Sequence, residues 1–148
     1  MATFPIEWGK VREYARATAA ARPAYLDDPA APIPPTFLAT VVYWDRLGHT
    51  VRTSEVAQAC ATVGVTVDRK SLLSLEQEYI FHGPLPRAGE TLYTCERLHD
   101  VEIKQTRSGP MVVVRFVVSF HDDVSRRDGG VPRAECWYTS AYLRKERS

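Results

Sequence analysis

The sequence has few cysteines and almost no net charge, and each of these absences excludes a class of protein. Its three cysteines, Cys60, Cys95 and Cys136, are widely spaced and form no C-x-x-C pair, which argues against a disulfide framework or a zinc ribbon. We expect free, mostly buried thiols. A net charge of +1 provides no field that would attract nucleic acid or an anionic membrane surface.

Long apolar runs and metal-ligand spacings are also missing. No apolar run approaches the ~20 residues that span a bilayer, and residues 1–7 lack the pattern of a signal peptide, so we expect a cytoplasmic protein. No H-x-x-x-H or H-E-x-x-H spacing is present, and we expect no metal site. A length of 148 residues suits one domain with one core, so residues 1–148 are expected to form a single domain.

Helical signals dominate the first part of the chain. Val11, Tyr14, Ala15 and Thr18 recur at helical spacing and predict an amphipathic helix between residues 8 and 18. Residues 19–35 contain five prolines, so we expect an irregular loop there.

Two further helices are expected after this loop. Thr36 precedes the apolar run 37–44 and is the expected N-cap of a buried helix, with Gly48 as its stop. Ser54 is expected to cap a shorter helix that Gly64 ends.

The second half of the chain changes to a period of two. Leu73, Leu75, Gln77, Tyr79 and Phe81 share one face of a predicted strand, whose other face is polar, so we expect one buried side. Further strands are expected at 91–104, 111–120 and 134–143, separated by turns rich in glycine and proline. Helices followed by four strands predict an α+β fold in which an antiparallel sheet wraps around a helix.

Several segments, in their order and spacing, carry a resemblance to a known family. They are GKVREYARA at 9–17, PPTF at 34–37, residues 64–68, and LSLEQEYIFHGPL at 73–85 followed by AGE at 88–90. Together they resemble the N-terminal type of the MaoC-like dehydratases, also described as FAS1-like dehydratase domains. The resemblance implies a hot-dog fold, with a curved antiparallel sheet around a long central helix from Thr36 to about Leu47, and domains that pair edge to edge as a double hot dog.

The resemblance also implies where catalytic residues would stand. In catalytic members of the superfamily, an Asp and a His belong to a D-x-N-P-x-H loop after the first helix, and a backbone N–H at the start of the central helix polarises the thioester carbonyl. Here Pro23 matches the proline of that motif, Ala20 the Asp and Tyr25 the His. Alanine has no titratable group, and a phenol with a pKa near ~10 is a poor general base. The standard dyad is therefore replaced.

Other residues are weaker candidates for the site. His82 and Asp27 are candidate catalytic groups, with a structural hydrogen bond and a solvated loop as the respective alternatives. Candidate substrate-binding residues are Thr36 and Phe37 at the start of the central helix, Tyr43 and Trp44 along it, and Tyr25 in the loop. Core packing is the alternative role of the aromatic residues. His99-Asp100 and His121-Asp122 are expected on the surface, because neighbours on a strand point to opposite faces.

These expectations favour a subunit of an (R)-specific 3-hydroxyacyl-thioester dehydratase or enoyl-thioester hydratase, specifically the non-catalytic, acyl-binding half. Its expected ligand is an acyl group on coenzyme A or acyl carrier protein, with no other cofactor. Its expected partner is a MaoC-like hot-dog subunit or a second copy of itself. One alternative is a self-sufficient dehydratase or thioesterase that uses His82, Tyr25 or Asp27. Another is a homodimer that binds an acyl thioester or small molecule without reaction.

Overall fold

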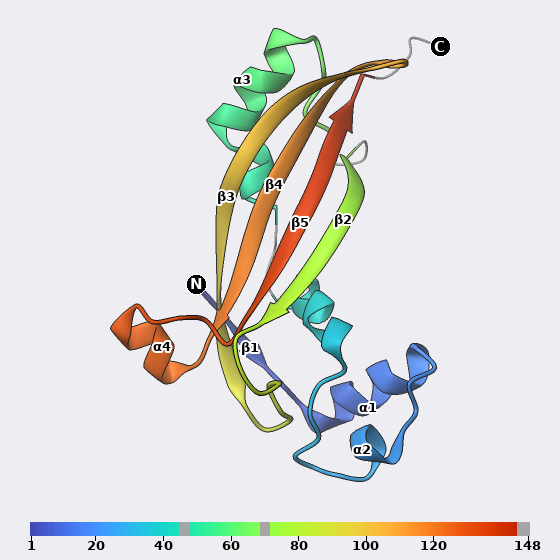
Figure 1. Ribbon diagram of the computed structural model, residues 1–148, viewed down its shortest axis with the longest axis vertical. Helices are drawn as coiled ribbons and strands as arrows, with labels where there is room; N and C mark the ends of the chain where they lie inside the picture. The colour runs from blue at the N-terminus through green and yellow to red at the C-terminus, as the bar shows by residue number, and fades with distance from the viewer. Residues whose placement is uncertain (45–47, 69–71, 145–148) are drawn as a thin grey trace. The chain divides into compact units, whose positions relative to one another are not determined.

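The structure, a computed structural model, describes residues 1–44, 48–68 and 72–144. In these residues five strands form one sheet in the order β1-β3-β4-β5-β2 (Figure 1). The strands are β1 (Ala2–Pro5), β2 (Leu72–Phe81), β3 (Thr91–Thr106), β4 (Gly109–His121) and β5 (Ala134–Leu143). The α-helices are α1 (Trp8–Ala17), α2 (Pro23–Leu26), α3 (Ser54–Thr62) and α4 (Asp123–Asp128), and the 3₁₀-helices are η1 (Pro35–Tyr43) and η2 (Thr50–Arg52). The predicted α+β class is confirmed.

The strands run antiparallel, as predicted. The short strand β1, which the sequence pattern did not indicate, pairs with residues 91–94 of β3 in antiparallel register. Where β2 meets β5, the His82 N–H donates to the Arg133 carbonyl at 3.1 Å, and the Thr139 hydroxyl donates to Glu76 at 3.4 Å. Residue numbers therefore rise along one strand as they fall along the other.

The chain divides into two compact units, which are described separately. The described residues of the first unit are 1–44, 79–95 and 119–136, and those of the second are 48–68, 72–78, 96–118 and 137–144. Strands β2, β3, β4 and β5 each contribute residues to both units.

Phe4 of β1 lies in the core of the first unit and is fully buried. Its ring packs on Phe120 of β4, with 5.5 Å between ring centroids, and on Phe37 of η1, with 6.1 Å. On α1, Val11 and Ala15 are also fully buried. Aromatic pairs of this kind add to the free energy gained by burying their area, so η1 is held against the strands of this unit through its first turn.

The buried helix begins earlier than expected and is tighter. Pro34 is the N-cap of η1, so the prediction that Thr36 would be the cap was wrong. Proline suits the first helical position, because its φ is preset and it has no N–H that would go unsatisfied. Pro35 takes that position and moves Thr36 into the first turn. The predicted end near Leu47 lies outside the described residues.

Two short α-helices were not expected. The prediction of an irregular loop over 19–35 was wrong for α2, which begins with a proline at its first position. α4 is held by a capping box in which Asp122 accepts the Ser125 N–H at 2.8 Å and the Ser125 hydroxyl accepts the Asp122 N–H at 3.1 Å. Gly129, with φ of +63°, ends this helix.

In the second unit, α3 follows η2 directly. Thr53 caps α3, because its hydroxyl accepts the Val56 N–H at 3.4 Å, so the prediction of Ser54 as the cap was wrong by one residue. Gly64, with φ of +66°, follows the end of the helix as expected.

Side-chain hydrogen bonds tie η2 to the sheet of the second unit. The Glu96 carboxylate of β3 accepts the N–H groups of Gly48 and Thr50 as well as the Thr50 hydroxyl. The hydroxyl of Tyr142, a fully buried residue of β5, donates to the Val51 carbonyl at 2.8 Å.

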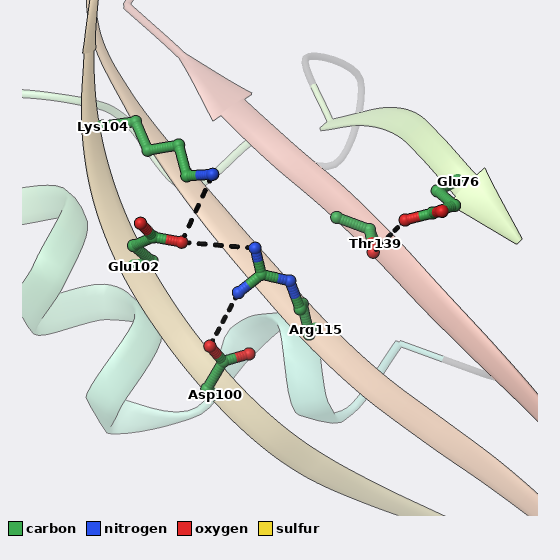
Figure 2. A network of polar contacts seen from close by, with 6 residues as sticks. All are labelled: Glu76, Asp100, Glu102, Lys104, Arg115 and Thr139. Atoms are coloured by element: carbon green, nitrogen blue, oxygen red, sulfur yellow. Dashed lines mark hydrogen bonds and ion pairs between the residues drawn. The ribbon is translucent and has the colours of Figure 1, made fainter.

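An ion-pair network joins β3 and β4 in the same unit. Figure 2 shows Arg115 between two carboxylates, at 2.7 Å from Asp100 and 3.2 Å from Glu102, while Lys104 lies 3.4 Å from Glu102. Asp100 is thus engaged by an arginine, and the neighbouring His99 ring packs edge-on against Trp137. Partly exposed pairs such as these contribute little to stability.

Strand β2 has no buried face along most of its length, and this contradicts the sequence-based prediction. Residues 73–78 are exposed, with Leu73 at 45% and Leu75 at 50% of their full area. β2 stands last in the sheet order. An alternating pattern predicts that one face is covered, but no element in the described part of this chain covers it.

Candidate functional site: an apolar cavity in the first unit

A cavity of about 460 Å³ lies in the first unit between α1 and η1. Its α1 wall consists of Lys10, Glu13, Tyr14 and Ala17. Positions i, i+3, i+4 and i+7 follow one another along one side of an α-helix, so a single stripe of α1 forms this wall. The volume falls within the range of about 300–1,000 Å³ that is usual for small-molecule sites.

The opposite wall is formed by η1 and its C-cap residue. It consists of Phe37, Thr40, Tyr43 and the C-cap Trp44. A 3₁₀-helix has three residues per turn, so the side chains of Phe37, Thr40 and Tyr43 are stacked above one another. An α-helix would turn each of these side chains somewhat away from the one before it, so the 3₁₀ geometry of η1 aligns them more closely.

Two hydroxyl groups in these walls, those of Tyr14 and Thr40, form hydrogen bonds within the protein. The Tyr14 hydroxyl donates to the carbonyl of Thr36 at 3.0 Å and lies 2.8 Å from the Thr36 hydroxyl. The Thr40 hydroxyl donates to the Phe37 carbonyl at 2.8 Å. Lys10 and Glu13 form an exposed ion pair at 3.0 Å. The cavity thus offers mainly carbon to a ligand, and its charged residues are paired with each other.

The predicted site residues do not all meet at this cavity. Phe37, Tyr43 and Trp44 line it, whereas Thr36 is connected to it through Tyr14. Phe37 is almost fully buried, while Tyr43 is 85% and Trp44 43% exposed.

The residues that the sequence analysis expected at the positions of the catalytic loop are not among the lining residues. Ala20 follows α1, where its N–H donates to the Ala15 carbonyl at 2.8 Å. Tyr25 lies in α2, half-buried, and Asp27 is the exposed C-cap of that helix. No carboxylate and imidazole are brought together at this loop.

His82 belongs to a different group of residues in the first unit, here named the polar cluster: His82, Glu90, Asp122, Arg133 and Glu135. His82 Nε2 lies 3.0 Å from Glu135 Oε2. Arg133 lies 3.5 Å from Glu90 and 3.6 Å from Asp122. A histidine oriented by a carboxylate is the pairing that a general base requires, but none of these residues lines the cavity.

Other titratable groups in the first unit are poorly suited to catalysis. Burial, and then the neighbouring Cys136 and Tyr14, raise the pKa of the Tyr79 phenol above its usual range, so it stays protonated. Cys136 is fully buried, and a buried thiol is unreactive. Of the expected buried thiols, Cys60 and Cys136 are buried and Cys95 is exposed. In the described residues, no three His, Cys, Asp or Glu side chains are placed to hold a metal ion.

The family can now be assigned from the match to a family model. Residues 1–125 match the model described as "FAS1-like, dehydratase domain region". The chain belongs to this family. The resemblance seen in the sequence is thereby confirmed.

Two solved structures resemble this FAS1-like dehydratase domain. One is the C-terminally truncated HadBC complex, a 3R-hydroxyacyl-ACP dehydratase from Mycobacterium tuberculosis, with a TM-score of 0.63, 22% identity, and coverage of 94% of this chain and 89% of the other. The second is the ChsH1–ChsH2 complex from Mycobacterium tuberculosis, with a TM-score of 0.64, 18% identity, and coverage of 99% and 83%. The predicted hot-dog fold is confirmed. None of the curated proteins matches the sequence.

Five of the eight residues that line the cavity of this FAS1-like dehydratase domain were not predicted as site residues: Lys10, Glu13, Tyr14, Ala17 and Thr40. The four on α1 form a stripe of helical spacing, of which the sequence analysis used only Tyr14, as part of the apolar face. Thr40 stands three positions after the predicted site residue Phe37, and this spacing is the signal that could have found it. Among the described residues, no helix is both long and apolar enough to cross a membrane.

Proposed function

We propose that this chain is the acyl-binding, non-catalytic half of an (R)-specific 3-hydroxyacyl-thioester dehydratase or enoyl-thioester hydratase. The observation that carries the proposal is the chemistry of the cavity. The hydroxyls of Tyr14 and Thr40 donate to backbone carbonyls of η1, and the charged residues of the lining, Lys10 and Glu13, form an exposed pair. Such a cavity suits a hydrocarbon tail, and its described lining contains no histidine that could act with a carboxylate on a reacting carbon.

Family membership supports the reaction class. Removing a proton beside a thioester carbonyl requires a base, and the charge that develops on the oxygen requires preorganised donors. The proposal takes Ala20 and Tyr25 as the residues at the positions of the dyad, and the described residues that line the cavity include no histidine. The proposal therefore assigns the Asp and His to a partner subunit. The substrate is a thioester of coenzyme A or acyl carrier protein, and no further cofactor takes part.

The exposed strand β2 supports a hot-dog partner. Leu73 and Leu75 are about half exposed at the end of the sheet order, and a strand edge with apolar side chains is a template for pairing with another strand. The two similar solved structures are both complexes of two differently named subunits. A second copy of this chain would cover the same edge, so the two kinds of dimer must be separated by experiment.

The test measures hydration of enoyl thioesters by the chain alone, by a candidate MaoC-like partner, and by their mixture. We expect hydration only when the partner is present. For substrates with long acyl tails, the mixture should be more active than the partner alone. Ala17→Trp fills the cavity from an exposed position of α1 and should raise KM for long-tailed substrates by about tenfold or more, with a smaller effect on short-tailed ones. Arg16→Trp adds the same group beside the cavity and is the matched control.

A second function is favoured by one observation, the contact between His82 and Glu135. If the chain is a self-sufficient dehydratase, it turns over the thioester alone, and His82→Gln or Glu135→Gln abolishes that activity. If the proposal holds, both variants leave the activity of the mixture unchanged. Binding of thioesters without turnover in any mixture, by a homodimer, would instead support a binding protein and contradict the proposal.

A further inference from the structure

We infer that Tyr14 is a positioning residue that sets the width of the cavity and thereby selects the shape of the acyl group. The inference deepens the proposed function and rests on it in taking an acyl tail as the ligand. Within the described residues, the hydrogen bonds that connect α1 with η1 both come from the Tyr14 hydroxyl, to the carbonyl and hydroxyl of Thr36.

The ring of Tyr14 acts at the same place as its hydroxyl. It meets Phe37 edge-on, with 5.5 Å between ring centroids and 84° between ring planes. Phe37 is in turn held in the core by Phe4. One side chain of the α1 wall is therefore fixed to the first turn of the η1 wall by both polar and aromatic contacts, and the first turn is fixed to the core.

The other side-chain hydrogen bonds of the described wall residues stay within one helix. Lys10 pairs with Glu13 within α1, and the Thr40 hydroxyl bonds within η1. The hydroxyl of Thr18 likewise bonds within α1, to the Tyr14 carbonyl at 2.9 Å. Loss of the Tyr14 hydroxyl would leave the walls without a hydrogen bond between them. The separation of the walls would then be set by apolar contacts, which are not directional.

A change in width should appear as a change in selectivity. A pocket of fixed width distinguishes ligands that differ by a single methyl branch by about tenfold or more. A pocket whose walls can separate admits the branched ligand more readily. The predicted effect is therefore on the ratio of two affinities, which a general loss of stability would not alter.

The experiment measures Kd for a straight-chain acyl-coenzyme A and its methyl-branched isomer, and for the corresponding free alcohols. Tyr14→Phe keeps the ring and removes the hydroxyl, and should shift the ratio by about fivefold to tenfold in favour of the branched ligand. Thr36→Val removes one of the two hydrogen-bond partners of the Tyr14 hydroxyl and should give a smaller shift. Thr18→Val, which removes a hydroxyl bond within α1, is the matched control and should leave the ratio unchanged.

The outcomes separate this inference from the proposed function. If Tyr14→Phe weakens both ligands equally, or leaves both unchanged, Tyr14 does not set selectivity and the inference is overturned. If the wild-type protein binds the alcohols but no thioester, the proposed function fails, while the ratio for the alcohols still tests Tyr14. If it binds neither, both fail.

Discussion

An active site normally combines a space for the ligand with reactive side chains. In the first unit these two features lie in separate places, the cavity and the polar cluster. The cavity has room for a ligand and mainly apolar walls, in which the Tyr14 and Thr40 hydroxyls and the Lys10–Glu13 pair are engaged within the protein. The polar cluster has a histidine 3.0 Å from a carboxylate and an arginine near two others, but none of its residues lines that cavity. Titratable groups indicate a catalytic site only where a substrate can reach them.

The two regions also differ in how they are stabilised. The η1 wall is anchored by the buried ring of Phe37, whereas the polar cluster depends on charged groups that remain partly in contact with water. Burial of a large apolar side chain contributes several kcal/mol, and partly exposed ion pairs contribute far less. Substitutions in the two regions should therefore have effects of different size.

The largest effect is expected for Phe37→Ala. Phe37 is 2% exposed and contacts both Phe4 and Tyr14, so its truncation should lower the free energy of unfolding by about 3–5 kcal/mol. Urea denaturation measures this change. Tyr43→Ala is the control on the same wall, since Tyr43 is 85% exposed, and should cost no more than about 0.5 kcal/mol. Equal losses would show that η1 is not anchored through Phe37.

An intermediate effect is expected for Arg133→Met in the polar cluster. The substitution keeps an unbranched chain but removes contacts with Glu90, Asp122 and the Pro84 carbonyl. With its side chain 24% exposed, Arg133 should contribute about 1–2 kcal/mol, because partial exposure reduces the electrostatic gain. Lys10→Met breaks the more exposed Lys10–Glu13 pair, whose side chains are 56% and 66% exposed, and should cost less than about 0.5 kcal/mol. If Arg133→Met lowered the free energy of unfolding as much as Phe37→Ala does, the proposed difference in stabilisation between the cavity and the polar cluster would be contradicted.

A smaller effect that depends on pH is expected at Asp122. The hydrogen bond from the Ser125 N–H, with further help from the Ser125 hydroxyl and Arg133, lowers the pKa of Asp122 below its usual value of 3.8. A lowered pKa in the folded state means that the stabilisation is present above the unfolded pKa and is lost as the pH falls through the folded one.

Asp122→Ala should therefore cost about 1 kcal/mol at neutral pH, and the difference from the wild type should shrink as the pH falls below about 4. Urea denaturation at a series of pH values measures it. Asp122→Asn keeps a capping side chain that does not titrate, and its stability relative to Asp122→Ala should stay constant across this range. A cost of Asp122→Ala that is independent of pH would contradict the assignment.

Much of the fold followed from local patterns. The alternation of residues 134–143 predicted β5 at its observed bounds, and Gly64 was identified as the end of α3 because a left-handed residue commonly follows a helix. The errors arose where a neighbour in sequence changed the local geometry. Pro35 takes the first position of η1 and so moves the start of that helix. The capping box of Asp122 and Ser125, which begins α4, was not recognised in the sequence.

The sequence by itself determined the strand pattern, the two segments that form the cavity walls, and the absence of a carboxylate and an imidazole from the loop at Ala20 to Tyr25, because these depend on residue type and local periodicity. Only the tertiary structure decided which stripes face each other, that Tyr14 reaches Thr36, that His82 meets Glu135, and that β2 is left uncovered. These contacts join residues far apart in the chain, and a local pattern specifies which face of an element is apolar but not what that face will meet.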